Sequence, residues 1–250
     1  MFKKYFENKR AALFNLDSAV IPGLNYIKIK SFQRSMDDLF LGYIDPTPYC
    51  IPGYSFRTIW ESILYANELE KGNFKIKDLI EKTTDVFLDI VNKESFNFEP
   101  AEGFWELLAD LVEDHGYETA LISNYPKTIQ ETLSKKAEID GVFDAVVFNE
   151  NTKEELHKIY KKALKKLKVG PKKAVSFEGS IPGVRAANKA KVDVFVIWDL
   201  ETRKSLFGDN VKEFSMDFTV FPGNIDKTYE EYLAESARGA LEDKEQRQDL

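Results

Sequence analysis

The stretch Ala11-Ala-Leu-Phe14-Asn15-Leu-Asp17-Ser18 places a short apolar run directly before a polar one. Four consecutive apolar residues bounded by polar ones are typical of a buried strand, and the residues that follow predict a loop at its carboxyl end. Because open parallel sheets bind ligands at the carboxyl ends of their strands, this loop is the first candidate for chemistry.

The segment that follows this strand and loop has a helical pattern. From about Pro22 to Asn97 the apolar residues recur at three- and four-residue spacing, which predicts helices over residues 27–41, 56–69 and 76–91. Turn signals separate them at residues 46–48, 52–53 and 71–73. We therefore expect residues 22–97 to form a helical cap inserted after the first strand.

Beyond Pro100 strands and helices alternate. The predicted strands are residues 118–122, 143–148, 173–177, 193–198 and 218–221, and the helices between them are 103–112, 128–136, 153–167 and 181–190. This alternation predicts an α/β fold, a three-layer Rossmann-like parallel sheet core, built from residues 1–21 and 98–236. The polar tail, residues 237–250, is expected to fray.

The composition excludes several classes of protein. The 250 residues carry a net charge of −7, which gives no reason to expect a nucleic-acid partner. The lysine-rich run over residues 158–168 reads as the solvated face of an outer helix. The single cysteine, Cys50, excludes an intrachain disulfide and favours the cytoplasm or another reducing compartment, with an organelle matrix left open. Neither a membrane span nor a secretory signal is predicted.

Four loops, at residues 15–20, 123–125, 149–152 and 178–183, follow the predicted strands. Their sequences, among them Ala120-Leu-Ile-Ser123-Asn124 and Phe177-Glu178-Gly179-Ser180, come in the order and at the spacing of the four motifs of the haloacid dehalogenase superfamily. The chain is most similar to the capped phosphatase and β-phosphoglucomutase branch, and the resemblance covers nearly its whole length. It implies the same α/β core with a cap.

The resemblance also implies a role for each motif position. In the family, the first carboxylate of the first motif attacks phosphorus and the second acts as general acid and base. Asn15 stands at the first of these positions and Asp17 at the second. Ser123 and Asn124 match the residues that bind the phosphate group. An amide is a very poor nucleophile, so the catalytic pair is degenerate.

The motifs for the lysine and the metal ion also depart from the family. Glu154 stands where the family has a lysine, and either Lys153 or Lys158 could substitute for it in phosphate binding. Asp17, through its backbone carbonyl, and Glu178 match the Mg²⁺ ligands, but Gly179 replaces an aspartate. Mg²⁺ prefers oxygen ligands and carboxylates, so we expect weak binding or none.

Each retained residue also has a structural interpretation. Asp17 could cap its own turn, Ser123 could satisfy neighbouring amides, and Glu178 could be a loop acid that binds no metal. An engineered Asp→Asn trap at Asn15 would leave the other motifs intact, whereas Ala19 and Gly179 are altered as well. A naturally degenerate site is therefore the simpler interpretation.

Two hypotheses about function follow. The first is a family member without phosphatase activity, which binds a protein partner or a small phosphorylated ligand, or serves in a larger assembly, without a cofactor. The aromatic residues of the cap could supply a partner surface or could simply form the cap core: Tyr26, Phe32, Phe40, Tyr43, Tyr49 and Tyr54. The second is a Mg²⁺-dependent phosphomonoester hydrolase or phosphomutase with a rebuilt site. It needs a replacement carboxylate near Asn15, and Glu150, Glu154 and Glu155 lie in a suitable loop.

Overall fold

The computed structural model describes residues 2–69, 74–149, 155–200 and 202–228, together with residues 230, 231 and 234. Its centre is a six-stranded parallel sheet with the strand order β3-β2-β1-β4-β5-β6. The strands are β1 (Ala11–Asn15), β2 (Glu118–Ser123), β3 (Ala145–Phe148), β4 (Ala174–Glu178), β5 (Asp193–Ile197) and β6 (Val211–Ser215). The predicted α/β architecture is confirmed.

Both faces of the sheet are covered by helices, so its central strand is buried on both sides. Ala11 and Leu13 point toward α7 (His157–Lys166) and α8 (Ile181–Lys189), while Ala12 and Phe14 point toward α5 (Phe104–Ala109) and α6 (Lys127–Lys136). The stacked rings of Phe14 and Phe177, whose centroids lie 4.9 Å apart, are central to the second layer. Successive side chains of β1 thus point to opposite faces of the sheet, and both faces are buried. This explains why the sequence of the first strand is continuously apolar.

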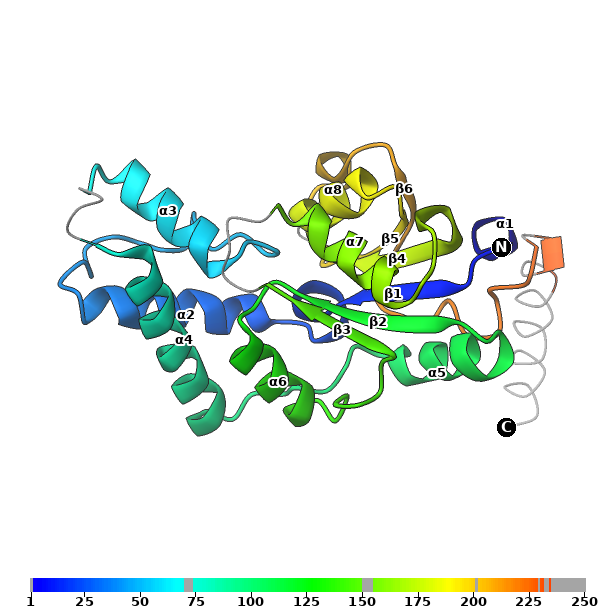
Figure 1. Ribbon diagram of the computed structural model, residues 1–250, viewed down its shortest axis with the longest axis horizontal. Helices are drawn as coiled ribbons and strands as arrows, with labels where there is room; N and C mark the ends of the chain where they lie inside the picture. The colour runs from blue at the N-terminus through cyan, green and yellow to red at the C-terminus, as the bar shows by residue number, and fades with distance from the viewer. Residues whose placement is uncertain are drawn as a thin grey trace, which may run out of the picture.

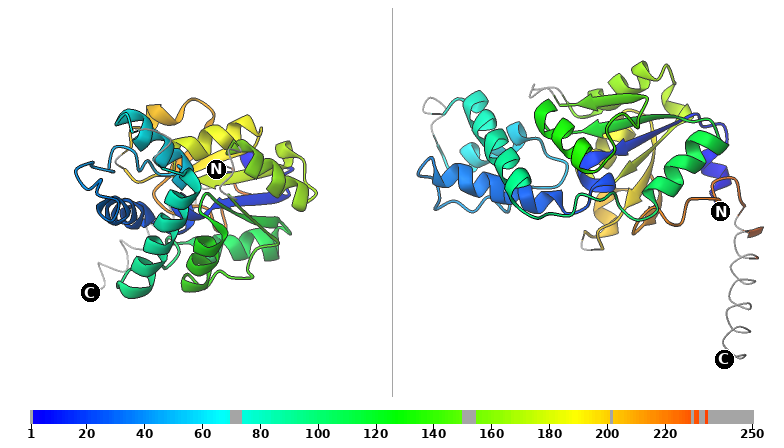
Figure 2. Two further views of the ribbon diagram at one scale, coloured as in Figure 1. Left: turned by 60° about the vertical axis from the view of Figure 1, so that its left-hand side comes forward. Right: turned by 90° about the horizontal axis from the view of Figure 1, so that it is seen from below.

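The helical insertion lies between β1 and β2, as predicted. It comprises α2 (Leu24–Asp37), α3 (Phe56–Ala66) and α4 (Ile76–Lys93), and it extends from the end of the core toward which β1 runs (Figures 1 and 2). Its interior is aromatic: the Phe32 ring packs against Phe56 and Trp60. The Trp60 indole N–H donates to Thr83 Oγ1 at 2.9 Å, which satisfies its buried polar atom.

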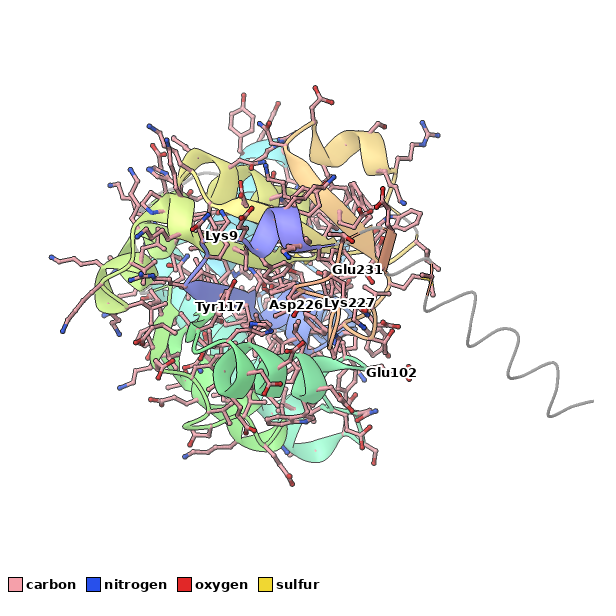
Figure 3. All side chains as sticks on the ribbon, turned by 90° about the vertical axis from the view of Figure 1, so that its right-hand side faces the viewer. Lys9, Glu102, Tyr117, Asp226, Lys227 and Glu231 are labelled. Carbon is pink, nitrogen blue, oxygen red and sulfur yellow. The ribbon has the colours of Figure 1, made fainter. Side chains whose placement is uncertain are left out.

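The opposite end of the sheet is closed by the N-terminal segment and by the chain after β6 (Figure 3). There the short helix α1 (Lys3–Phe6) donates from the Lys3 N–H to the Lys227 carbonyl at 3.2 Å. The Tyr117 hydroxyl donates to the Phe6 carbonyl at 3.1 Å. Lys9 Nζ lies 2.6 Å from the Asp193 carboxylate. This end is thus fixed by contacts far from the strands' carboxyl ends.

The last predicted strand is wrong. Residues 218–221 form turns, and the sixth strand is Val211–Ser215 instead. Phe218 and Phe221 are fully buried against Phe177, so their apolar pattern reflects a buried turn. The true strand lies at the edge of the sheet and is largely half-buried, so it lacks a strong apolar signal.

Other segments differ from prediction mainly at their ends. The helix expected over 103–112 is α5 continued by the π-helical segment η2 (Asp110–Asp114). Short 3₁₀ segments, η3 (Pro171–Lys173) and η4 (Lys204–Phe207), connect later elements. The tail predicted to fray, residues 237–250, lies outside the described residues. In the described part of the chain, no helix is both long and apolar enough to cross a membrane.

Candidate functional site

The candidate site lies where the strand order reverses, at the carboxyl ends of β1, β2 and β4. β1 pairs with β2 on one side and β4 on the other, so the loops after these three strands meet. They bring together the side chains of Asn15, Asp17, Ser123 and Glu178, all of which are buried. Three of the four sequence motifs therefore converge as predicted by their strand-end positions.

Asn15 organises the loop after β1, which continues as the π-helical segment η1 (Leu16–Val20). Its Oδ1 accepts hydrogen bonds from the Asp17 backbone N–H at 3.2 Å and from the Ser18 hydroxyl at 3.0 Å. Ser18 Oγ in turn accepts from the Gly179 N–H at 3.2 Å, which ties this loop to the one after β4. Asn15, rather than Asp17, is the residue that caps the turn.

Asp17 is paired with a lysine that the sequence motifs did not indicate. Lys28 Nζ, on the cap helix α2, lies 3.3 Å from Asp17 Oδ2, and both side chains are almost completely buried. The ammonium also lies 3.5 Å from the Tyr54 carbonyl and 5.1 Å from the centre of the Tyr125 ring. Asp17 Oδ1 is buried without a hydrogen-bond partner. The acid/base position of the first motif is thus held by an ion pair.

The loop after β2 is in contact with the cap. Ser123 Oγ accepts a hydrogen bond from the Tyr125 N–H at 3.1 Å, and Asn124 Nδ2 donates to the Gly53 carbonyl. The buried Tyr125 ring packs on Phe56 of the cap at 5.8 Å. Burial raises the pKa of the Tyr125 phenol well above its ordinary value. The two predicted phosphate-binding side chains are therefore engaged within the protein.

Glu178 ends β4 in a completely buried position. Its Oε1 accepts hydrogen bonds from the Tyr160 hydroxyl of α7 at 2.6 Å and from Ser176 Oγ at 2.8 Å, and Oε2 has no partner. Burial is the largest effect and raises the pKa of Glu178 to about 8, although the Tyr160 hydrogen bond acts in the opposite direction. The carboxyl group is consequently mostly protonated near pH 7.

Gly179 leaves no room for a side chain. A Cβ atom there would overlap the Ser18 carbonyl oxygen and would lie 3.1 Å from the Ile197 carbonyl oxygen. Both neighbours are backbone atoms, which cannot rotate away. An aspartate at this position would therefore require the loop after β1 to move.

The residues of the site do not form a metal cluster. Within the described ranges, no group of three or more histidine, cysteine, aspartate or glutamate side chains is placed to hold a metal ion. Near the expected ligands Asp17 and Glu178, Lys28 contacts the first and Tyr160 the second. Gly179 contributes only backbone atoms.

Of the residues expected from the third motif, Lys153, Glu150 and Glu154 lie outside the described residues. Lys158, the second lysine considered, is exposed on α7. The buried lysine is Lys28, and one signal could have found it: it shares the buried face of α2 with Leu24, Ile27 and Ser31. A lysine on the apolar side of an amphipathic helix needs a partner.

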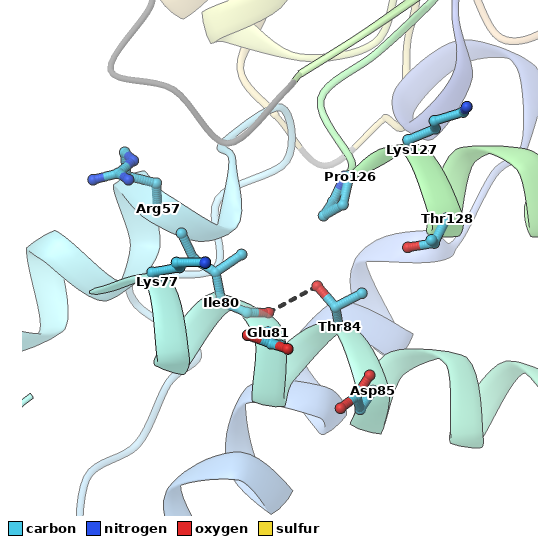
Figure 4. A pocket seen from close by; sticks show the side chains of 9 residues that line it. All are labelled: Arg57, Lys77, Ile80, Glu81, Thr84, Asp85, Pro126, Lys127 and Thr128. Carbon is cyan, nitrogen blue, oxygen red and sulfur yellow. Dashed lines mark hydrogen bonds between the residues drawn. The ribbon is translucent and has the colours of Figure 1, made fainter. Parts of the chain in front are cut away.

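Two clefts adjoin the boundary between cap and core. One, of about 550 Å³, reaches Asp17, Ser18 and Gly179, and its described lining contains Asp199 and Asp217 but no lysine or arginine. The other, of about 680 Å³, lies between α3, α4 and the start of α6 (Figure 4). Its lining carries charges of both signs: Arg57, Lys77 and Lys127 together with Glu81 and Asp85. This second cleft is separate from the motif residues.

Comparisons with known proteins agree with this architecture. The family model described as haloacid dehalogenase-like hydrolase matches residues 13–197. No curated protein matches the chain. CbbY from Rhodobacter sphaeroides, solved in complex with phosphate, is 19% identical with a TM-score of 0.69, over 84% of this chain and 95% of that one.

A mutant of the same CbbY, solved with xylulose-(1,5)bisphosphate, has the same TM-score of 0.69 at 19% identity, over 84% of this chain and 95% of that one. A β-phosphoglucomutase from Clostridium difficile has a TM-score of 0.71 at 18% identity, over 93% of this chain and 99% of that one. At identities of 18% and 19%, these structural similarities show a shared fold and nothing more specific.

A first prediction concerns Gly179. Gly179→Ala should lower the free energy of unfolding by about 3 kcal/mol, because the new methyl group must displace the Ser18 backbone. Urea denaturation measures the change. Gly170→Ala is the matched control, since a Cβ there meets nothing within 4 Å, and it should change stability by less than about 0.5 kcal/mol. Equal effects of the two substitutions would contradict the packing described for Gly179.

A second prediction concerns pH. The pKa of Glu178 is about 8 in the folded protein against 4.5 ordinarily, so the folded state binds this proton more tightly. The resulting stabilisation is complete below about pH 4.5 and is lost as the pH rises through about 8. Glu178→Gln should therefore flatten the fall in stability over this window. The exposed Glu113→Gln should leave the slope unchanged, and an unchanged slope in Glu178→Gln would refute the assignment.

Proposed function

The chain belongs to the haloacid dehalogenase-like hydrolase family, and from that premise we propose that it has lost phosphoryl-transfer chemistry and serves a binding or structural role, as a subunit of a larger assembly. The observation that carries this proposal is the packing at Gly179. The position that holds a metal-binding aspartate in the resembling family has no space for any side chain.

The nucleophile position supports the same conclusion. The amide of Asn15 is neutral, and its oxygen already accepts two hydrogen bonds within its own loop. Loss of a nucleophile that acts as part of a catalytic unit costs on the order of 10⁶ in turnover. With Asn15 in a capping role, Asp17 has no attacking group to assist.

The residues present do not fit Mg²⁺. The ion requires near-octahedral oxygen ligands and usually one or two carboxylates. Asp17 is paired with the Lys28 ammonium, Glu178 carries a proton near neutral pH, and Gly179 offers no side chain. We therefore propose a site without a resident metal, and no catalytic step is derived through one.

Binding of a phosphorylated ligand is also disfavoured. The cleft that reaches Asp17 has acidic residues in its described lining and no lysine or arginine, which repels a phosphate dianion. Asn124 is hydrogen-bonded to Gly53 of the cap, and a phosphate group would have to displace this contact. We therefore do not expect this chain to bind the sugar bisphosphate that is present in the CbbY mutant complex, and that compound can be used to test the expectation.

The alternative function, a rebuilt Mg²⁺-dependent hydrolase or phosphomutase, needs another carboxylate near Asn15. Among the three candidates, Glu150 and Glu154 lie outside the described residues. Glu155 is exposed, forms an ion pair with Lys189 and lies 3.0 Å from His157 Nδ1, so it is directed to other partners. These contacts favour the non-catalytic proposal.

The cap offers a surface for the proposed assembly. Its aromatic side chains include several that are largely exposed, namely Tyr26, Phe40, Tyr43 and Tyr65. Phe40 is 92% exposed and has a positive φ of 59°, an unfavourable conformation for a bulky residue. Exposed aromatic residues are enriched in protein interfaces, which supports a protein partner at the cap.

The proposal is tested by assaying hydrolysis of an aryl phosphate and a panel of sugar and nucleotide phosphates with excess Mg²⁺. We expect no turnover above buffer for the native chain or for Asn15→Asp, because restoring the nucleophile leaves Gly179 without a carboxylate. A catalytically active family member assayed in parallel verifies the conditions. Turnover by the native chain that disappears in Asp17→Ala would overturn the proposal.

A further inference from the structure

We propose that the ammonium group of Lys28, in place of a divalent cation, compensates the buried Asp17 carboxylate and holds the cap closed on the core. This inference rests on the proposed loss of phosphoryl-transfer chemistry, because it assigns the charge that a metal would otherwise supply. It gives the only internal cation of the described site a defined role.

The first argument is the position of Lys28. The residue lies on α2 of the cap, yet its side chain is 1% exposed and its Nζ is 3.3 Å from Asp17 Oδ2 on the core. Nζ also lies 3.5 Å from the carbonyl of Tyr54 and 5.1 Å from the ring centre of Tyr125. One ammonium thus joins the loop after β1, the cap loop before α3 and the loop after β2.

The second argument is charge balance. A buried carboxylate without compensation is very unfavourable, so Asp17 requires a positive partner. Among the described residues, its ion-pair partner is the Lys28 ammonium, 3.3 Å from Oδ2, and both side chains are almost completely buried. Asp17 and Lys28 therefore compensate each other's charge.

The third argument is that the cap is fitted to this closed arrangement. Gly53, in the cap loop, accepts the hydrogen bond of Asn124, and its φ of +81° suits glycine. A Cβ atom on Gly53 would overlap Ser180 Oγ in the loop after β4. The cap loop therefore touches two core loops at the same point at which Lys28 enters the site.

The native chain provides the first test. Because Lys28 is covalently part of the site, adding MgCl₂ or EDTA should shift the midpoint of thermal unfolding, Tm, by less than about 1 °C. A Tm that rises with Mg²⁺ at millimolar concentration, and falls again with EDTA, would show that the site takes a divalent cation and would overturn the proposal.

A double-mutant cycle tests the pair itself. Lys28→Met and Asp17→Asn should each lower Tm by about 10 °C, because each leaves one buried charge unpaired, while the double variant should recover more than half of either loss. Lys9→Met, which breaks the Lys9–Asp193 pair at the other end of the sheet, is the matched control. Strictly additive losses in the cycle would refute the pairing.

Cys50 reports on closure of the cap. It is the chain's single cysteine, it is 1% exposed, and it lies in the loop that carries Gly53 and Tyr54. Under native conditions its reaction with a thiol reagent should be at least tenfold faster in Lys28→Met than in the native chain. Lys9→Met should leave the rate unchanged, which separates opening of the cap from general loss of stability.

These readouts are independent of the hydrolysis assay. Turnover by the native chain would overturn the proposed function even if the cycle showed coupling between Asp17 and Lys28. Conversely, the native chain could show no turnover while the losses in the cycle are additive and the Cys50 reaction rate in Lys28→Met is unchanged. That combination would support the proposed function and overturn the role given to Lys28. A Tm that rises with Mg²⁺ in Lys28→Met but not in the native chain would support the proposal that the Lys28 ammonium compensates Asp17 in place of a divalent cation.

Discussion

A buried carboxylate must be compensated, and Asp17 imposes this requirement on the whole site. It is buried at the carboxyl end of the central strand, where the sheet topology brings three loops together. A metal ion, a proton or a basic side chain can each provide compensation. In this chain Lys28 provides it for Asp17, while burial raises the pKa of the neighbouring Glu178 to about 8. The two acids of the site are thus stabilised by different means.

This solution links the chemistry of the site to the position of the cap. Lys28 belongs to the first helix of the cap, whereas Asp17 belongs to the loop after β1 in the core. Its pairing with Asp17 therefore favours the same closed arrangement as the contacts of Asn124 with Gly53 and of Tyr125 with Phe56. A closed cap is consistent with the proposed binding or structural role, which requires no exchange of substrate and product.

Much of the fold could be predicted because strand and helix periodicities are local properties of the sequence. The central strand, the helical insertion and the order of the later elements follow from apolar spacing and turn residues. Phe218 and Phe221 led to the wrong prediction of a strand, because a buried turn and a buried strand share the same apolar pattern. In the site, strand-end positions correctly brought Asn15, Ser123 and Glu178 together. Lys28 was missed because its partner is set by how α2 packs, a tertiary property that no motif encodes.

The unusual residues of the site are best understood as one coupled set. Gly179 allows the Ser18 carbonyl to approach the loop after β4, and Ser18 in turn donates to Asn15 and accepts from the Gly179 N–H. A carboxylate at position 179 would push this loop away and break both hydrogen bonds. It would also add a negative charge beside Asp17, which Lys28 alone could not balance. A side chain at position 179 therefore conflicts with the hydrogen bonds around Asn15, so the glycine and the arrangement of the loop after β1 depend on each other.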